Sequence, residues 1–247
     1  MNRLNYAMLL WLADAQELRD SFANRVVRHR QSDGVIITSV IDTDPLFSYL
    51  VQHNRLFVMV ETPPRYADRV NYVTVNNEAA AEEVVQHLVE IGRRRIATVT
   101  GLLTMQDAVD RLTGYKNGLQ RAGLPVDPAL IIYGGFHHDE GYKGMKQLLQ
   151  LDPIPDAVFA GGDTIATGVI QAIREAGLRV PEDVAVVGFD DLDVAVRANL
   201  TTVCHSVQTV GSTAAQLLID LIEGRLEHPQ RIVLPTRLTI RGSTVGV

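Results

Sequence analysis

The chain has 247 residues, of which 46% are apolar and 21% are charged, a composition typical of a folded soluble protein and not of a disordered one. A net charge of −6 disfavours direct nucleic-acid binding by these residues, because such binding needs a basic surface. The single cysteine, Cys204, excludes an internal disulfide, and no segment approaches the roughly 20 apolar residues that cross a bilayer. We therefore expect a cytoplasmic protein without membrane contact, and we favour two lobes of roughly 100 to 150 residues over one large domain.

Strand and helix patterns alternate along the chain. Short apolar runs predict strands at residues 6–11, 34–38, 56–61, 72–75, 96–100, 130–133, 157–160 and 184–189. Apolar residues at helical spacing predict helices at residues 14–29, 77–92, 107–122, 139–149, 163–177 and 207–223. Such alternation predicts parallel sheets with helices on both faces.

The segment at residues 159–191 reads as one strand-helix-strand unit. Asp163 follows two glycines at the end of the first strand and is a candidate N-cap for the helix. The continuous apolar run at residues 184–189 predicts a strand buried on both faces, and it is followed by Asp190 and Asp191. Because ligands bind at the carboxyl ends of parallel strands, this unit predicts one side of a ligand cleft.

Five segments together carry a family resemblance. They are VNNEAAAEEVVQHLVEIGRRRIATVTG from residue 75, DRLTGYKNGLQRAGL from residue 110, the unit at 159–191, LTTV at 200–203 and LPTRLTIRGST at 234–244. In order and spacing they resemble the effector-binding core of the lac repressor and gal repressor family. The resemblance implies an α/β fold of the type I periplasmic-binding-protein kind, with two Rossmann-like lobes, parallel sheets flanked by helices, and three crossing segments.

The same resemblance implies where the two lobes divide. The first lobe comprises residues 1–77 and 206–234, and the second comprises residues 78–205 and 235–247. The crossings then fall near Asn77, His205 and Pro235. In relatives a helix-turn-helix head, a hinge helix and the first strand and helix of the core come before the segment that residues 6–11 resemble. We hypothesise that this chain is a fragment of a longer regulator, or that it begins at an internal methionine, with its first lobe incomplete at the start.

The resemblance assigns ligand contacts to five residues. Arg111 matches the family's cleft arginine, Asp190 its cleft aspartate and Phe136 an aromatic that stacks on the ligand. His205 occupies a place where relatives often carry glutamine, and Asp163 lies next to Gly162, where relatives often carry a ligand-binding asparagine. Without the resemblance, each residue has a structural alternative. Arg111 would be a solvated or salt-bridged surface arginine, and Asp163 and Asp190 would be capping residues. Phe136 would be a packed loop aromatic and His205 a structural histidine.

Sequence motifs of enzymes are missing from the chain. It has no nucleophile elbow, P-loop, G-x-G-x-x-G or zinc-binding His-Glu signature, so we expect no enzyme activity and no cofactor. His137, His138 and Asp139 lack a third spaced ligand, so we expect a solvated loop and no metal site.

The resemblance also predicts the function. It implies the ligand-sensing core of a bacterial transcription regulator that binds a small-molecule effector, a sugar, between its lobes. DNA would be read only through a head absent from this chain, and a homodimer is expected. The alternative is a free-standing sugar-binding protein of a transport system. A hexose, a pentose, a disaccharide or a purine would all suit Arg111, Asp190 and Phe136.

Overall fold

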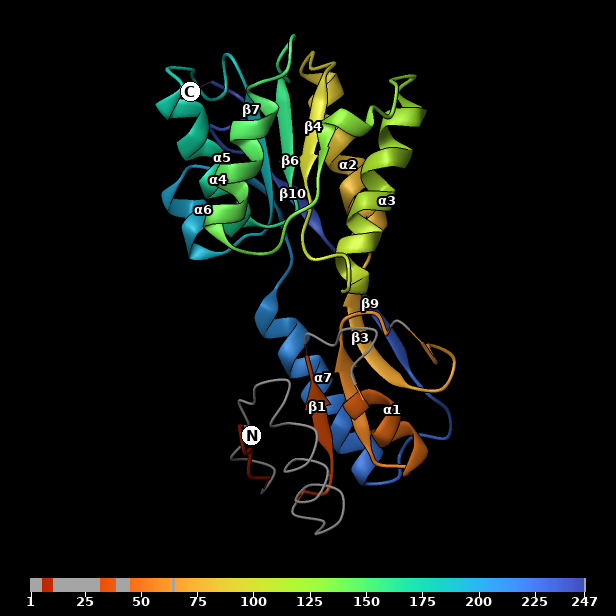
Figure 1. Cartoon of the computed structure of the whole chain (residues 1–247). Coiled ribbons are helices and arrows are strands. Elements are labelled where there is room, and N and C mark those ends of the chain that lie inside the picture. The colour runs from red at the N-terminus through yellow and green to blue at the C-terminus, as the bar shows by residue number, and fades with distance from the viewer. Residues whose placement is uncertain (1–5, 11–31, 39–44, 64, 247) are drawn as a thin grey trace.

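The structure of the chain, a computed structural model, describes residues 6–10, 32–38, 45–63 and 65–246. Figure 1 shows two α/β bodies, one above the other in the view, and each is built on its own sheet. We call the body with the four-stranded sheet the first lobe and the body with the six-stranded sheet the second lobe. None of the helices described is both long enough and apolar enough to cross a membrane.

The first lobe is a parallel sheet with the strand order β1-β2-β3-β9. Its elements are β1 (Val35–Ile37), α1 (Pro45–Gln52), β2 (Phe57–Val60), β3 (Asn71–Val75), α7 (Val207–Ile222) and β9 (Arg231–Leu234). Successive strand residues point to opposite faces of the sheet. Met59 therefore joins the apolar cluster that includes α1, whereas its neighbour Val58 joins the cluster that includes α7.

The strand predicted at residues 6–11 is wrong for the part that the structure describes. Residues 6–10 have no regular secondary structure, and Met8, Leu9 and Leu10 are exposed. An apolar run forms a strand only where a neighbouring strand completes its hydrogen bonds, and β1 pairs with β2 alone among the described strands. Residue 11 and the helix predicted at residues 14–29 lie outside the described residues.

The second lobe is a six-stranded sheet with the order β10-β8-β7-β6-β4-β5, in which β10 alone runs antiparallel to its neighbour. Its strands are β4 (Ile96–Val99), β5 (Ile131–Ile132), β6 (Ala157–Ala160), β7 (Ala185–Asp190), β8 (Thr201–Cys204) and β10 (Arg237–Thr239). Its helices are α2 (Asn77–Glu90), α3 (Gln106–Arg121), α4 (His138–Leu148), α5 (Asp163–Glu175) and α6 (Asp193–Arg197), with a 3-10 turn η3 at Pro128–Leu130.

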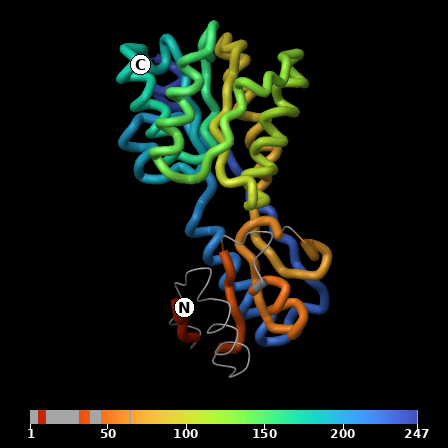
Figure 2. The backbone as a smooth tube through the Cα atoms, in the orientation of Figure 1, coloured from red at the N-terminus to blue at the C-terminus, as the bar shows by residue number. Residues whose placement is uncertain are grey.

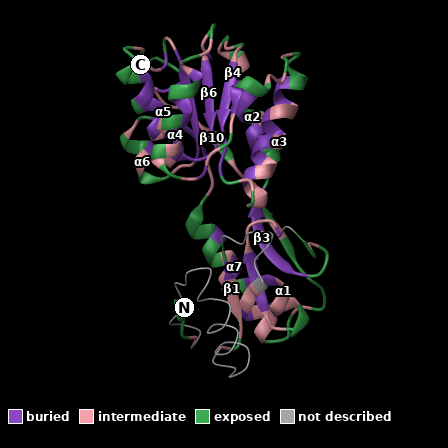
Figure 3. Ribbon diagram, in the orientation of Figure 1, coloured by how far each residue is buried: buried purple, intermediate pink, exposed green. Residues whose placement is uncertain are grey.

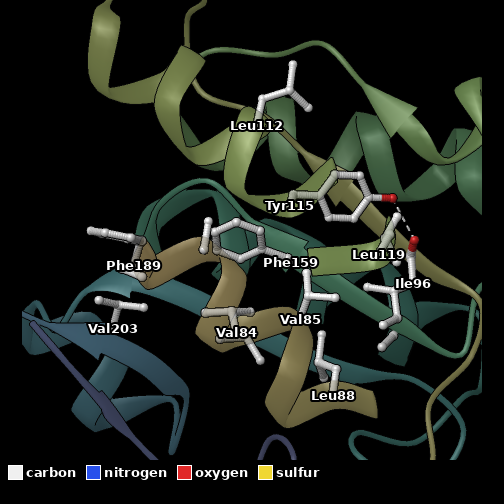
Figure 4. Close-up of a cluster of buried hydrophobic side chains, with 14 of the residues drawn as sticks. Val84, Val85, Leu88, Ile96, Leu112, Tyr115, Leu119, Phe159, Phe189 and Val203 are labelled. Atoms are coloured by element: carbon white, nitrogen blue, oxygen red, sulfur yellow. Dashed lines mark hydrogen bonds between the residues drawn. The ribbon is translucent and has the colours of Figure 1, made fainter. Parts of the chain in front are cut away.

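Helices cover both faces of this sheet. The α2–α3 pair packs on one face and the α4–α5 pair on the other, so the strands between them are buried along their length (Figure 3). Figure 4 shows the core on the α2–α3 side, where Phe159 and Phe189 of the sheet meet Val84 and Leu88 of α2. The Tyr115 hydroxyl donates to the Ile96 carbonyl at 2.8 Å, the dashed line in the view.

The chain passes between the two lobes three times (Figure 2). It leaves the first sheet after β3 to form α2, returns after β8 to form α7, and leaves again after β9 to form β10. These passages agree with the three crossing segments that the sequence implies. The lobe boundaries at residues 77, 205–206 and 234–235 stay a prediction, which the sheet membership of the flanking strands supports.

The helix ends follow their local chemistry. Asn76 precedes α2 and caps it, because its side-chain oxygen accepts a hydrogen bond from the Ala79 N–H at 3.0 Å. Gly92, just past the end of the helix, has a φ of 91°, a left-handed conformation that glycine adopts without strain. These two residues mark the two ends of α2. Asn77 is its first residue and lies at the first passage between the lobes.

Candidate ligand-binding site

The carboxyl ends of the parallel strands in both sheets point toward the junction between the lobes, whereas the antiparallel β10 begins there (Figure 1). At the edge of the second-lobe sheet, β6 ends before Gly161, β7 ends at Asp190 and β8 ends just before His205. The amino end of α2 lies at the first passage between the lobes, where it carries Asn77. Polar side chains from separate parts of the chain therefore meet at one edge.

Arg111 is the centre of this cluster. It lies on α3 and is buried, with a relative exposure of 8%. Its Nε donates to Asn77 Oδ1 at 2.8 Å, one terminal nitrogen donates to the Gly161 carbonyl at 2.7 Å, and the other donates to Asp190 Oδ1 at 3.3 Å. The guanidinium carbon lies 3.6 Å from the centre of the Phe189 ring. The plane of the guanidinium is thus fixed from four directions.

Asp190 is held as a carboxylate. Burial raises the pKa of Asp190, but the charges of Arg111 and His205 and their hydrogen bonds outweigh burial, so the pKa lies below its ordinary value. The side chain keeps 28% of its surface exposed. An ionised carboxylate that is partly open at the junction is an acceptor for hydroxyl groups.

His205 lies beside Asp190 at the second passage between the lobes. Its Nε2 is 3.3 Å from Asp190 Oδ1, and its ring centre is 6.3 Å from that of Phe189. Its Nδ1 is buried, and no described residue forms a hydrogen bond with it. The structure therefore brings three of the five predicted ligand contacts, Arg111, Asp190 and His205, into one contact group, and their contact with a ligand stays a prediction.

The turn after β7 has an unusual backbone. Asp190 and Asp191 have φ angles of 104° and 56°, a region that residues with a side chain seldom adopt. Arg241 stabilises the turn, because its guanidinium donates to Asp191 Oδ1 at 2.7 Å and to the Leu200 carbonyl at 2.8 Å. In the sequence Arg241 belongs only to the family motif at residues 234–244; its contacts with the turn depend on the fold, which brings that segment to Asp191.

Asp163 also stabilises the turn after β7, through a hydrogen bond from the Leu192 N–H. It is fully buried; Oδ2 accepts from the Leu192 N–H at 2.8 Å and Oδ1 accepts from the Thr202 hydroxyl at 2.6 Å. Its prediction as the N-cap of α5 is wrong, because Gly162 is the N-cap and Asp163 is the first helical residue. The carboxylate points toward β8 and the turn instead of back to its own helix. Burial raises the pKa of Asp163 to about 6.

The ligand contact assigned to Asp163 stays a prediction, although both of its oxygens are engaged within the protein. Phe136 is half-buried and packs with the apolar cluster around α4 and α5. A Cβ atom added at Gly101 would lie 2.5 Å from the Phe136 ring, so the ring lies directly against that backbone. No ring contact found among the described residues joins Phe136 to Arg111 or Asp190, and its stacking on a ligand also stays a prediction.

Two further residues belong to the cluster. Asn77 was predicted only to lie near a crossing, and its side-chain oxygen accepts a hydrogen bond from Arg111 Nε. Asp107, in the first turn of α3, accepts a long hydrogen bond of 3.4 Å from the Thr62 N–H, which follows β2 of the first lobe. Burial raises the pKa of Asp107, and the nearby charge of Arg111 partly offsets that increase. This contact joins the two lobes directly at the site.

His137 and His138 lie at the start of α4, where His137 is the N-cap and its N–H donates to Glu140 Oε2 at 2.9 Å. Within the described part of the chain, no group of three or more His, Cys, Asp or Glu side chains is arranged to hold a metal ion. The local chemistry of these residues is that of a helix start.

The chain is similar to a known protein family and to proteins of known name. Residues 85–244 match the family described as a periplasmic binding protein-like domain. The HTH-type transcriptional regulator CelR of Thermobifida fusca is 39% identical over 214 residues, which cover 85% of this chain and 63% of the relative. Catabolite control protein A of Priestia megaterium is 30% identical over 244 residues, which cover 97% of this chain and 73% of the relative. The chain thus spans less than two thirds of the CelR sequence.

A solved structure of similar sequence has the same fold. The complex of the transcriptional regulator CelR with cellobiose superposes with a TM-score of 0.86 at 37% sequence identity, covering 93% of this chain and 69% of that one. These two relatives and this solved structure are named as transcriptional regulators, not as enzymes.

Proposed function

Because this chain belongs to the lac repressor family of transcriptional regulators, with the periplasmic-binding-protein-like fold of its effector core, we propose that it senses a sugar bound between its two lobes. The bound sugar changes how the lobes are arranged and so controls DNA binding by a head outside these 247 residues. We further propose that the protein acts in the cytoplasm as a homodimer, without an enzymatic step of its own.

The observation that carries the proposal is the hydrogen-bonding capacity left at Arg111 and Asp190. A guanidinium has about five N–H donors, and three of them are used by Asn77, Gly161 and Asp190. A carboxylate has roughly four acceptor positions, and Arg111 and His205 occupy positions on Oδ1 only. A sugar hydroxyl both accepts and donates, so neighbouring hydroxyls match a fixed donor beside a fixed acceptor.

The comparisons support a sugar over other small molecules. The solved CelR structure is a complex with cellobiose, and its protein is 37% identical to this chain. We therefore choose cellobiose as the first compound to test, with glucose, ribose and a purine base as alternatives. The same comparisons favour a regulator over a transport protein.

The signal passes through differential affinity for two arrangements of the lobes. A ligand shifts an equilibrium only by the difference between its affinities for the two states. The Asp107–Thr62 contact and the cluster around Arg111 lie where the lobes meet, so a sugar bound there contacts groups whose positions depend on that arrangement. Closure or twisting would move the first lobe, which in this proposal carries the DNA-reading head.

A thermal-shift screen of the chain with cellobiose and the alternative compounds tests the proposal. A bound compound at 100 times its dissociation constant stabilises the protein by about 2.7 kcal/mol. We expect one sugar to raise the unfolding temperature, and Arg111→Ala and Arg111→Lys both to abolish that rise, since lysine keeps the charge but lacks the planar donors. Arg174→Ala, at an exposed position late in α5, is the control and should respond like the wild type. A sugar that stabilises Arg111→Ala as much as the wild type would remove Arg111 from the site.

A further inference from the structure

Three carboxylates lie close enough around the turn after β7 to affect one another, and two of them have a cationic partner. Asp190 pairs with Arg111 at 3.3 Å, and Asp191 pairs with Arg241 at 2.7 Å. The third, Asp163, is fully buried, and within the described part of the chain no arginine, lysine or histidine pairs with it. A buried charge without a cation is costly, so Asp163 is the member of this cluster that most readily takes up a proton.

The Asp163 side chain links three elements of the second lobe. It belongs to the first residue of α5, its Oδ1 accepts from the Thr202 hydroxyl of β8 at 2.6 Å, and its Oδ2 accepts from the Leu192 N–H at 2.8 Å, just after the turn that ends β7. Gly188 of β7 leaves room for the carboxylate, because a Cβ atom added there would overlap Asp163 Oδ1. The carboxylate therefore holds α5, β8 and the turn together where β7 brings Asp190 to the junction.

The turn needs this support because of its backbone. The φ angles of 104° at Asp190 and 56° at Asp191 are unfavourable for residues with a side chain. A charged acceptor forms stronger hydrogen bonds than a neutral one, so an ionised Asp163 holds the Leu192 N–H more firmly than a protonated Asp163 does. A protonated carboxyl group must also place its own O–H against an acceptor. The charge on Asp163 thus decides how firmly the turn is held.

We propose that Asp163 is a positioning residue for the effector site, whose carboxylate, when ionised, holds the turn that presents Asp190, so that acid weakens effector binding. This inference rests on the proposed function, because it adds regulation by pH to the same sugar site. The role acts through the turn and needs no contact between Asp163 and the ligand. Burial raises the pKa of Asp163 to about 6, so the group changes charge close to neutral pH.

Other ionisable groups lie on the elements packed around Asp163. They are Asp190 and Asp191 of the turn, His205 after β8, Arg241 after β10, Asp193 at the start of α6 and Glu140 near the start of α4. The negative charges of Asp190 and Asp191 raise the pKa of Asp163 further. Histidine side chains in general change charge near neutral pH, and His205 contacts Asp190, so a His205 variant must accompany any test of Asp163.

Asp163→Asn keeps the shape of the side chain and cannot ionise. With cellobiose as the probe, or the sugar that the screen identifies, isothermal titration calorimetry gives the dissociation constant at each pH. For the wild type we expect a dissociation constant about threefold to tenfold higher at about pH 5 than at about pH 7.5. Asp163→Asn should bind with the weaker affinity at both pH values. His205→Gln should keep the pH dependence of the wild type, whatever its own affinity. A dependence lost in His205→Gln and kept in Asp163→Asn would overturn the proposal.

Asp193→Asn is the matched control, because it makes the same chemical change at an exposed position in α6 and should leave the affinity and its pH dependence unchanged. A second measurement needs only the wild type. Titrations at about pH 6 in buffers of different ionisation enthalpy should show that the sugar releases protons on binding, since it favours the ionised Asp163.

Arg111-dependent binding whose affinity is equal at both pH values, without proton release, would overturn the role of Asp163 and leave the proposed function intact. Absence of binding to every sugar by the wild type would overturn both.

Discussion

At the scale of single residues, the turn at Asp190 and Asp191 is positioned by two side chains from separate parts of the chain, Arg241 and Asp163. Arg241 pairs with Asp191, and Asp163 accepts from the N–H of Leu192. The positive φ angles at residues 190 and 191 are unfavourable by themselves, so these contacts are needed to hold the turn. Asp163 thus acts on the site as a positioning residue through the turn.

Ionisation of Asp163 makes the stability of the protein depend on pH. Burial raises the pKa of Asp163 from 3.8 to about 6 in the folded protein, whereas the unfolded chain keeps the ordinary value. Between these two values the folded state binds more protons, so the stability contributed by this residue is greatest at low pH and is lost as pH rises through about 6. Asp163→Asn cannot ionise, and its free energy of unfolding should lack this component.

We predict that the wild type loses on the order of 2 kcal/mol of stability relative to Asp163→Asn between about pH 4.5 and about pH 7. The asparagine oxygen can accept from Leu192 N–H while its amide donates to the Thr202 hydroxyl, so the variant should fold. Urea denaturation at both pH values measures the difference. Parallel pH profiles for the two proteins would show that Asp163 ionises normally in the folded state.

The residues of the site were predictable from sequence to different degrees. Arg111 and Asp190 were identified because each matches a family motif, and the structure brings them within 3.3 Å of each other. Asn77 was placed near a crossing, but its hydrogen bond to Arg111 could not be predicted, since it depends on where α3 lies. Arg241 belongs to a family motif, but its pairing with Asp191 could not be predicted, because the two residues are 50 positions apart and only the fold brings them together.

At the scale of elements, long periodic helices and buried apolar strands were predicted well, whereas short helices and half-exposed strands were not. The predicted β6 is fully buried and agrees with the structure at both ends, and α2, α3 and α7 agree within two residues. By contrast, α1, α6 and η3, and the strands β9 and β10, were not predicted from pattern. A helix of eight residues or fewer has at most about two turns, too few for its periodicity to stand out, and β9 and β10 lack a continuous buried apolar run.

The contact between α2 and α3 depends on a glycine at the interface. A Cβ atom added at Gly114 of α3 would overlap the Glu78 carbonyl oxygen and would lie 2.8 Å from the Ala81 Cβ of α2. Because α2 begins with Asn77 and α3 carries Arg111, the spacing of these helices also sets the length of the Asn77–Arg111 hydrogen bond. Close packing of the helix pair therefore helps to shape the site.

Gly114→Ala should lower the free energy of unfolding by at least about 2 kcal/mol, because the helices must separate to accept the methyl group. Gly211→Ala in α7 has open space around the new Cβ and should be neutral or stabilising by up to about 1 kcal/mol, as alanine favours helix. Chemical denaturation of both variants gives the comparison. Equal effects at the two glycines would show that the α2–α3 contact yields easily.

At the scale of the whole molecule, the parallel strands of both sheets end toward one junction, and three passages of the chain cross it. Alternation of strand and helix patterns was sufficient to predict parallel sheets covered by helices, and the length of the chain favoured two lobes. The crossings and the assignment of segments to lobes came from the family resemblance, since hydrophobic pattern contains no information on which sheet a strand joins. The strand predicted at residues 6–11 failed over residues 6–10 for a related reason, because pairing partners are a property of the whole sheet.

The central claim is that a sugar binds at the junction and is held by Arg111 and Asp190. A crystal structure of the chain with the sugar identified by the thermal-shift screen tests it most directly. We predict sugar hydroxyls within hydrogen-bond distance of both the Arg111 guanidinium and the Asp190 carboxylate, with the ligand between the two lobes. A sugar bound elsewhere, with Arg111 and Asp190 contacting only protein groups, would contradict the claim.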